Sequence, residues 1–169
     1  MKTNKILVMG VSGSGKSLIG HRVATALGMP FFDGDDYHPE QNVKKMRQGI
    51  PLTDQDRQGW LQTLNGLFRQ HTDLVVACSA LKPEYRDILR SNNDGITIIY
   101  LKGDFDTIWS RHKKRTNHYF SGEKMLISQF DTLVEPTPEE AIYIDIAKEA
   151  DDVVAQILSA LQGANDDQK

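Results

Sequence analysis

The chain has 169 residues, of which 39% are hydrophobic and 25% charged, so it is long enough to bury the core of one sheet-and-helix domain. Its 20 Lys and Arg and 23 Asp and Glu residues are interspersed and give a net charge of −3, which excludes the basic surface that nucleic-acid binding requires. No stretch approaches the roughly twenty apolar residues of a membrane span, and the single cysteine, Cys78, cannot form an internal disulfide. We therefore expect a cytoplasmic protein with neither a nucleic-acid nor a membrane partner.

The first half of the chain predicts two strands and three helices. Residues 5–9 (KILVM) form an apolar run typical of a buried strand, and after a glycine-rich turn a helical pattern reaches Leu27. Residues 28–30 (GMP) break this helix, and residues 31–33 predict a short second strand. A short helix opened by Pro39 follows to about residue 48, and a capping box at 53–56 (TDQD) predicts a longer helix over 54–70.

The second half continues the alternation. Residues 74–78, 96–101 and 141–146 predict strands three to five. A helix is expected to start at Pro83 and run to Leu89, and another to start at a cap at Asp104 and end in the basic stretch 111–115. A further helix follows that stretch and runs through Leu133, and a last one carries apolar positions from Val153 to Leu161. We expect one domain over residues 1–162 with a lid at about 111–126, and a flexible polar tail over 163–169.

Five short apolar strands alternating with helices predict a parallel sheet covered on both faces, which is a three-layer α/β/α sandwich of the α/β class. In such a sheet, every loop that follows a strand opens on the same edge, where ligands bind. The segments expected to converge there are residues 10–17, 33–38 and 79–82, together with Gly103.

Residues 10–17 (GVSGSGKS) match the phosphate-binding pattern G-x-x-x-x-G-K-[ST] and lie between a predicted strand and a predicted helix. The glycines let backbone N–H groups converge on phosphate oxygens at the positive end of the helix. We therefore predict that ATP and Mg²⁺ are bound here, with Lys16 reaching the outer phosphates and Ser17 ligating the metal. The nucleotide-binding residues are Gly10, Val11, Ser12, Gly13, Ser14, Gly15, Lys16 and Ser17. A glycine-rich turn that contains Lys-Ser by chance is the weaker alternative.

Two carboxylates follow the second predicted strand. Phosphoryl transfer needs charge neutralisation and a base for the attacking hydroxyl. Asp35 is the candidate base, and Asp33 is the candidate carboxylate that orients the magnesium; both also count as candidate acceptor-binding residues. The alternative is a D-G-D turn in which Asp36 caps a helix.

Arg111 and Arg115 lie one helical turn apart and precede a polar segment that can close over a nucleotide. We predict that they are catalytic, because guanidinium groups clamp phosphate oxygens and stabilise the charge that builds during transfer. The alternative is a solvated basic helix end, favoured by the helix dipole.

Cationic side chains follow the second and third predicted strands and suit an anionic acceptor. Arg57, Lys82 and Arg86 are the candidate residues, and His38 is a candidate hydrogen-bond donor to the same substrate. Arg57 is equally compatible with an ordinary position in its predicted helix.

Several blocks resemble the gluconate kinases, and the resemblance covers nearly the whole chain. The blocks include residues 9–17, 33–39 (DGDDYHP), 49–52 (GIPL), 78–82 (CSALK), 100–105 (YLKGDF) and 128–130 (SQF), with Asn42, Tyr85 and His118. The resemblance implies a P-loop kinase fold like adenylate and shikimate kinases, with a helical lid. It further implies ATP-dependent 6-phosphorylation of D-gluconate, commonly by a cytoplasmic homodimer. The chain departs from the family at Asn117, where a glycine is common, and in a lid that is one residue longer.

Other functions share the same loop and fold. A kinase for another small acceptor, such as idonate, shikimate or a nucleoside monophosphate, is the nearest alternative. A GTP-binding switch is a second one, since residues 56–59 (DRQG) match the pattern D-x-x-G. That match falls in a predicted helix, however, and no N-K-x-D motif follows it.

Overall fold

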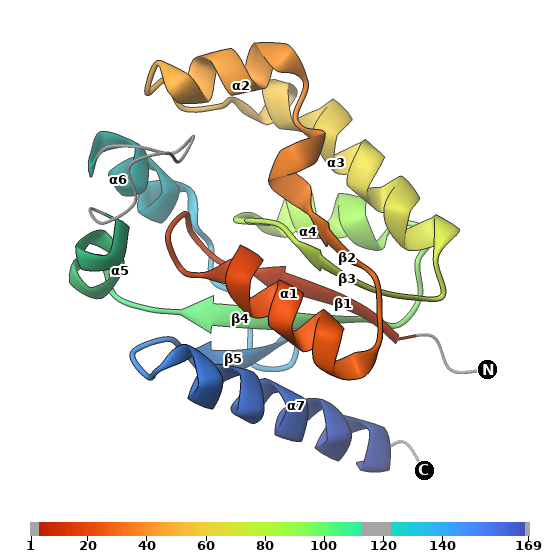
Figure 1. The fold of residues 1–169 in the computed structure, drawn as a ribbon. Helices are drawn as coiled ribbons and strands as arrows, with labels where there is room; N and C mark the ends of the chain where they lie inside the picture. The colour runs from red at the N-terminus through yellow and green to blue at the C-terminus, as the bar shows by residue number, and fades with distance from the viewer. Residues whose placement is uncertain (1–3, 113–122, 168–169) are drawn as a thin grey trace.

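The computed structural model describes residues 4–112 and 123–167. Five parallel strands form one sheet in the order β2-β3-β1-β4-β5 (Figure 1). Their bounds are Asn4–Met9 (β1), Phe31–Asp33 (β2), Asp73–Ala77 (β3), Ile96–Lys102 (β4) and Ala141–Asp145 (β5). The central strand β1 is in register with both neighbours, so that Leu7 pairs with Val76 of β3 and with Ile98 of β4.

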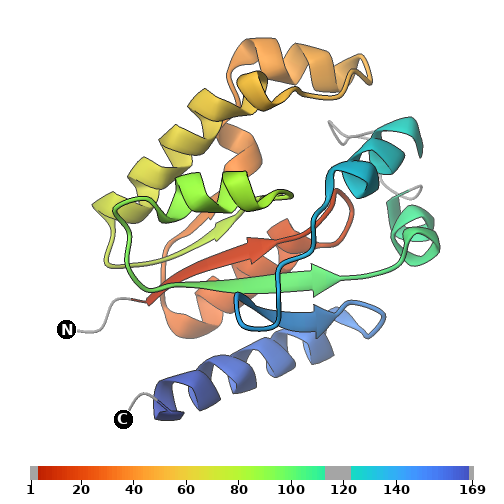
Figure 2. The same cartoon turned by 180° about the vertical axis from the view of Figure 1, so that it is seen from behind.

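Helices cover both faces of this sheet, as Figures 1 and 2 show from opposite sides. On one face α1 packs beside α7, and on the other α3 packs beside α4. The helices are Lys16–Leu27 (α1), Glu40–Arg47 (α2), Asp54–Gln70 (α3), Pro83–Arg90 (α4), Phe105–His112 (α5), Glu123–Thr132 (α6) and Ala150–Asp167 (α7), with a short 3₁₀ helix η1 at Gly34–Tyr37. The predicted three-layer α/β/α sandwich is confirmed.

The burial of β1 explains why its sequence is a continuous apolar run. Residues Ile6 to Met9 are each at most 3% exposed, because helices cover the sheet on both sides. Figure 1 shows that the strands point toward the side of the molecule that carries α5 and α6. A smaller apolar cluster of Met46, Leu52 and Met125 joins α2 to α6 on that side.

The element bounds differ from the prediction at a few ends. Strand β3 lies one residue earlier than predicted, and α7 continues to Asp167, so the tail expected to be flexible from Gly163 is helical over 163–167. The apolar spacing stops at Leu161, but a formed helix propagates through backbone hydrogen bonds without further apolar residues. Among the helices that the structure describes, none combines the length and hydropathy needed to cross a bilayer.

Candidate active site

The phosphate-binding loop connects β1 to α1 at the carboxyl edge of the sheet. Its first glycine is required by close packing, because a Cβ on Gly10 would lie 2.6 Å from Ser14 Oγ and 3.1 Å from the carbonyl oxygen of Leu101. Its last one, Gly15, has a φ of +91°, which favours glycine, at the N-cap of α1. Lys16 is only 6% exposed. The loop therefore has the backbone shape that presents N–H groups to phosphate oxygens.

A glutamine from α6 contacts this loop. The backbone N–H of Ser12 donates to Gln129 Oε1 over 3.3 Å, and Gln129 is 4% exposed. Gln129 belongs to the block 128–130 that resembles the gluconate kinases, but the sequence alone assigned it no role, since a glutamine in a helical pattern does not show what it contacts. Its burial in the fold shows that α6 is coupled directly to the loop.

Ser17 and Asp33, the two residues predicted to hold magnesium, lie in contact. Ser17 Oγ donates to Asp33 Oδ2 over 2.6 Å, while Asp33 Oδ1 accepts from the backbone N–H of Asp35 and caps η1. In the described residues no group of three or more His, Cys, Asp or Glu side chains could hold a metal ion alone. Magnesium commonly binds through one or two protein oxygens together with substrate phosphates, and this hydroxyl–carboxylate pair fits that mode.

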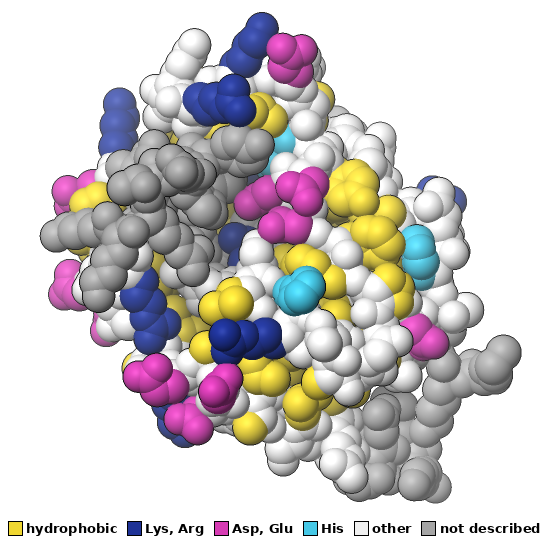
Figure 3. All heavy atoms as spheres, viewed as in Figure 1, with side chains coloured by type: hydrophobic (Ala, Val, Ile, Leu, Met, Phe, Trp, Pro, Cys, Tyr) yellow, Lys and Arg dark blue, Asp and Glu magenta, His cyan; other side chains and the backbone are white. Residues whose placement is uncertain are grey.

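Asp35 lies next in the same segment with its side chain 14% exposed. Burial raises the pKa of Asp35 to about 6; the ammonium of Lys16 acts against this rise, and the carboxylates of Asp33 and Asp36 add to it. Figure 3 shows acidic side chains gathered between α1 and α2 on this face. Asp35 is therefore a partly shielded carboxylate under the influence of the loop lysine, as a base for an attacking hydroxyl should be.

His38 faces Asp35 from the end of η1. Its Nε2 lies 3.9 Å from Asp35 Oδ1, and its ring stacks on Trp60 with centroids 3.9 Å apart. Burial, followed by the charges of Arg57 and Lys16, lowers the pKa of His38 to about 4. The imidazole is thus neutral at neutral pH. Trp60, a buried residue of α3, holds the ring in place through this stacking.

The structure brings Arg57 and Lys82 together through Tyr85 and Asp54, residues to which the sequence alone assigned no role in binding. Arg57, 6% exposed, donates from Nη1 to the hydroxyl of Tyr85 over 2.8 Å. That hydroxyl donates in turn to the carboxylate of Asp54, and Lys82 Nζ lies 3.1 Å from Asp54 Oδ1. Lys82 also lines a cavity of about 530 Å³ together with residues of α6. Two cations are therefore held at the start of α3 and of α4.

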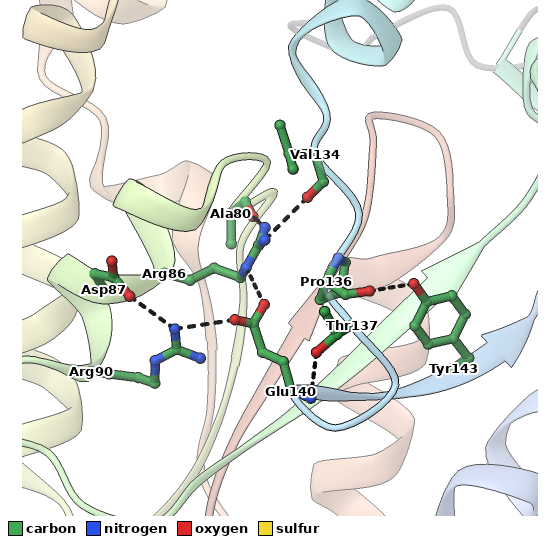
Figure 4. A network of polar contacts seen from close by, with 9 residues as sticks. All are labelled: Ala80, Arg86, Asp87, Arg90, Val134, Pro136, Thr137, Glu140 and Tyr143. Carbon is green, nitrogen blue, oxygen red and sulfur yellow. Dashed lines mark hydrogen bonds and ion pairs between the residues drawn. The ribbon is translucent and has the colours of Figure 1, made fainter.

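Arg86 is not part of this group, which corrects the prediction that it binds the acceptor. Its side chain is 1% exposed, and its guanidinium donates to Glu140 Oε1 (2.7 Å), the carbonyl of Ala80 (2.8 Å) and the carbonyl of Val134 (3.1 Å), as Figure 4 shows. All three nitrogens of the guanidinium thus donate hydrogen bonds to oxygen atoms of the protein itself. Arg86 is a structural residue because its helix turns this side chain inward, which the pattern of charges does not reveal.

Arg111 lines a second cavity, of about 310 Å³, beside the phosphate-binding loop. Gly13, Ser14 and Gly15 form one side of this cavity, and residues around the start of α7, among them Lys148 and Val153, form another. The predicted partner Arg115 and most of the predicted lid lie outside the described residues. Arg111 therefore lies on the nucleotide side of the site.

Comparisons with known proteins bear on the family to which this chain belongs. The family model described as Shikimate kinase matches residues 12–162. The thermoresistant gluconokinase of Escherichia coli (strain K12) is 46% identical over 92% of each chain, and the thermosensitive gluconokinase of the same organism is 42% identical over 95% of this chain and 89% of its own.

A crystal structure of a gluconokinase from Sinorhizobium meliloti 1021 superposes with a TM-score of 0.92 at 38% identity, covering 99% of this chain and 96% of that one. The full-length match in sequence and in structure confirms the resemblance found in the sequence blocks. The chain therefore belongs to the gluconokinase family of P-loop kinases.

Proposed function

We propose that this protein transfers the γ-phosphoryl group of ATP to the 6-hydroxyl of D-gluconate. The observation that carries the proposal is the group formed by Lys16 of the phosphate-binding loop, the shielded carboxylate of Asp35 and the neutral ring of His38. A new bond forms between the acceptor oxygen and phosphorus, the bond to ADP breaks, and the proton of the hydroxyl passes to Asp35.

The nucleotide half of the proposal rests on the loop and its neighbouring cavity. Residues 10–17 would bind the phosphates, and the cavity that Arg111 lines would take the nucleoside. Ser17 and Asp33 would hold magnesium, which when bound neutralises charge on the phosphates. Arg111 would approach the transferred group as the charge on it builds.

The acceptor half rests on the chemistry of a sugar acid. Its carboxylate needs cations, and Arg57 and Lys82 supply them within reach of Tyr85. Its hydroxyls need polar partners, and His38 and Asp35 supply a donor and an acceptor. Asp33, two residues before Asp35, would contact both the metal and the acceptor.

A coupled ADP-release assay tests the proposal. The panel should contain D-gluconate, idonate, shikimate and nucleoside monophosphates, each with magnesium and ATP or GTP, together with an acceptor-free control. We expect ATP-dependent ADP release only with D-gluconate. Release with another acid would keep the kinase chemistry and reassign the acceptor, whereas nucleotide hydrolysis without any acceptor dependence would contradict the proposal.

The proposal includes the location and the oligomeric state of the protein. The family resemblance implies that it is cytoplasmic and forms a homodimer. Light scattering coupled to size-exclusion chromatography at working concentration should give twice the mass of the 19.0 kDa chain. A monomer mass would reject the dimer without affecting the proposed reaction.

A further inference from the structure

Asn42 is fully buried in α2 and holds His38 from behind. Its Nδ2 lies 2.8 Å from the carbonyl oxygen of Asp56 and 3.2 Å from His38 Nδ1. A carbonyl oxygen only accepts hydrogen bonds, so the atom of Asn42 that faces Asp56 must be the NH₂ group and not the amide oxygen. The backbone of Asp56 therefore fixes which way the amide of Asn42 points.

This orientation decides where His38 carries its proton. An amide NH₂ group only donates, so His38 Nδ1 must accept and must be the unprotonated nitrogen. Because burial lowers the pKa of His38 to about 4, the ring carries a single proton at neutral pH. That proton is left on Nε2, the atom that faces Asp35.

The distance between His38 Nε2 and Asp35 Oδ1 leaves room for a hydroxyl group that bonds to both atoms. His38 Nε2 and Asp35 Oδ1 are 3.9 Å apart, too far for a direct hydrogen bond. A hydroxyl oxygen can lie about 2.8 Å from both atoms, accepting from His38 and donating to Asp35. Trp60 keeps the ring in this plane by stacking on it, and its own Nε1–H donates to the carbonyl of Gly34 over 2.7 Å.

The other end of Asn42 supports the same interpretation. Its Oδ1 is buried and has no hydrogen-bond partner among the described residues. An unpaired buried acceptor is destabilising. The fold nevertheless leaves Oδ1 unpaired while the NH₂ group donates to both Asp56 and His38. We infer that the hydrogen bonds of the NH₂ group are the reason for the position of this side chain.

We propose that Asn42 is a positioning residue that fixes the imidazole proton of His38 on Nε2, so that His38 donates a hydrogen bond to a hydroxyl of the acceptor beside Asp35. The identity of that hydroxyl rests on the proposed function. The position of the proton does not, since it follows from contacts within the chain alone.

Long-range ¹H–¹⁵N correlation spectra of the full, ligand-free chain measure the tautomer directly, because the protonated and unprotonated ring nitrogens have well-separated ¹⁵N shifts. We expect the Nε2–H form for His38 at neutral pH. The Nδ1–H form would overturn the inference whether or not the protein phosphorylates D-gluconate. Failure of the gluconate assay with the Nε2–H form present would reject only the proposed function.

The variant Asn42→Asp tests the consequence for catalysis. A carboxylate only accepts, so in the neutral ring it should move the proton of His38 to Nδ1 and turn Nε2 into an acceptor. Its negative charge also raises the pKa of the imidazole, so the variant is measured at a pH above that pKa. We expect kcat/KM for D-gluconate to fall about tenfold, the worth of one neutral hydrogen bond, with KM for ATP unchanged. An unchanged tautomer or an unchanged kcat/KM would contradict the inference.

Asn65→Ala is the matched control. Asn65 is also a buried asparagine, and its Nδ2 bonds the carbonyls of Ile88, Leu89 and Ser91. Its loss should lower the melting temperature while leaving the His38 tautomer and kcat/KM unchanged. Should Asn42→Asp fail to fold, the spectrum of the unmodified chain still decides where the proton lies.

Discussion

The side chain of Asp35 is largely buried, yet the proposed reaction requires its carboxyl group to be ionised. The pKa of its carboxyl rises on folding from 3.8 to about 6, mainly through burial. A base with that pKa is ionised at neutral pH and still a better proton acceptor than an exposed carboxylate. The same burial makes the ionised group unfavourable for the fold. Activity and stability should therefore respond to this side chain in opposite directions.

Asp35→Asn should lower kcat by about a thousandfold, since it removes the base. The affinity for ATP should stay nearly constant, because the phosphates bind to the loop. Steady-state kinetics and a nucleotide titration measure the two quantities. Asp36→Asn serves as the control, as Asp36 follows Asp35 directly but is exposed. Loss of ATP binding in Asp35→Asn would make Asp35 a metal-site or folding residue instead.

The pH dependence of kcat/KM in the unmodified protein should follow the ionisation of the same carboxyl. Activity should rise through about pH 6 and level off above it, because the base must be deprotonated. A profile that stays flat between about pH 5 and pH 7 would contradict the role of Asp35.

Asp35→Asn should also stabilise the fold at alkaline pH. Between about pH 4 and pH 6 the folded chain keeps a proton on Asp35 that the unfolded chain has lost, so stability falls as pH rises through this window. Above it the full cost is present, on the order of 2 to 3 kcal/mol. Urea unfolding should show a gain of about 2 kcal/mol for the variant at pH 8, and no gain below about pH 4. An equal effect at both pH values would contradict this origin.

At the level of the elements, Arg86 joins three segments that are distant in the chain. It reaches from α4 to the turn after β3 at Ala80, to the segment after α6 at Val134, and to Glu140 before β5 (Figure 4). Ala80 has a φ of +46°, a costly backbone conformation for a residue other than glycine. Arg86 therefore holds in place the turn that carries Lys82, two residues further on.

Arg86→Ala should destabilise the protein by about 3 kcal/mol, because it leaves Glu140 and two carbonyls without their main partner. Thermal or urea unfolding measures the loss. Arg90→Ala is the control on the same carboxylate: Arg90 is 32% exposed and pairs with Glu140 Oε2 over 3.2 Å, so its removal should cost less than about 1 kcal/mol. Equal losses in the two variants would contradict the structural role of Arg86.

At the scale of the whole molecule, the strand order brings the site together from distant parts of the chain. The loop after central strand β1 carries Lys16, and the segment after edge strand β2 carries Asp33, Asp35 and His38. Helix α6 closes the arrangement from the opposite side through Gln129 and through Met125, which packs with Met46 of α2. Helix α6 thus contacts both the phosphate-binding loop, on the proposed nucleotide side, and α2, on the proposed acceptor side.

Arg111→Ala tests whether the nucleotide side contributes to transfer. We expect kcat to fall by about a hundredfold or more if the guanidinium stabilises charge in the transition state. Arg22→Ala is the control, since Arg22 forms an exposed ion pair with Asp151 on α7. A rise in KM for ATP with kcat intact would mean that Arg111 only binds the nucleotide, which would contradict the clamp.

The sequence by itself determined the parts of this protein that depend on neighbouring residues. The loop at 10–17, the cap at Thr53 and the five strands were predictable, because apolar spacing, glycine positions and capping residues are local signals with fixed geometric meaning.

Only the tertiary structure decided what each side chain faces. Arg57 and Arg86 look alike in the sequence, yet Arg57 meets Tyr85 at the site and Arg86 is enclosed by Glu140 and backbone carbonyls. Asn42, Trp60 and Gln129 gain their contacts with His38 and Ser12 from the packing of α2, α3 and α6. Such contacts join residues from 4 to 117 positions apart in the chain. The local sequence pattern does not determine which face of a helix packs against which loop, because that depends on how the whole chain folds.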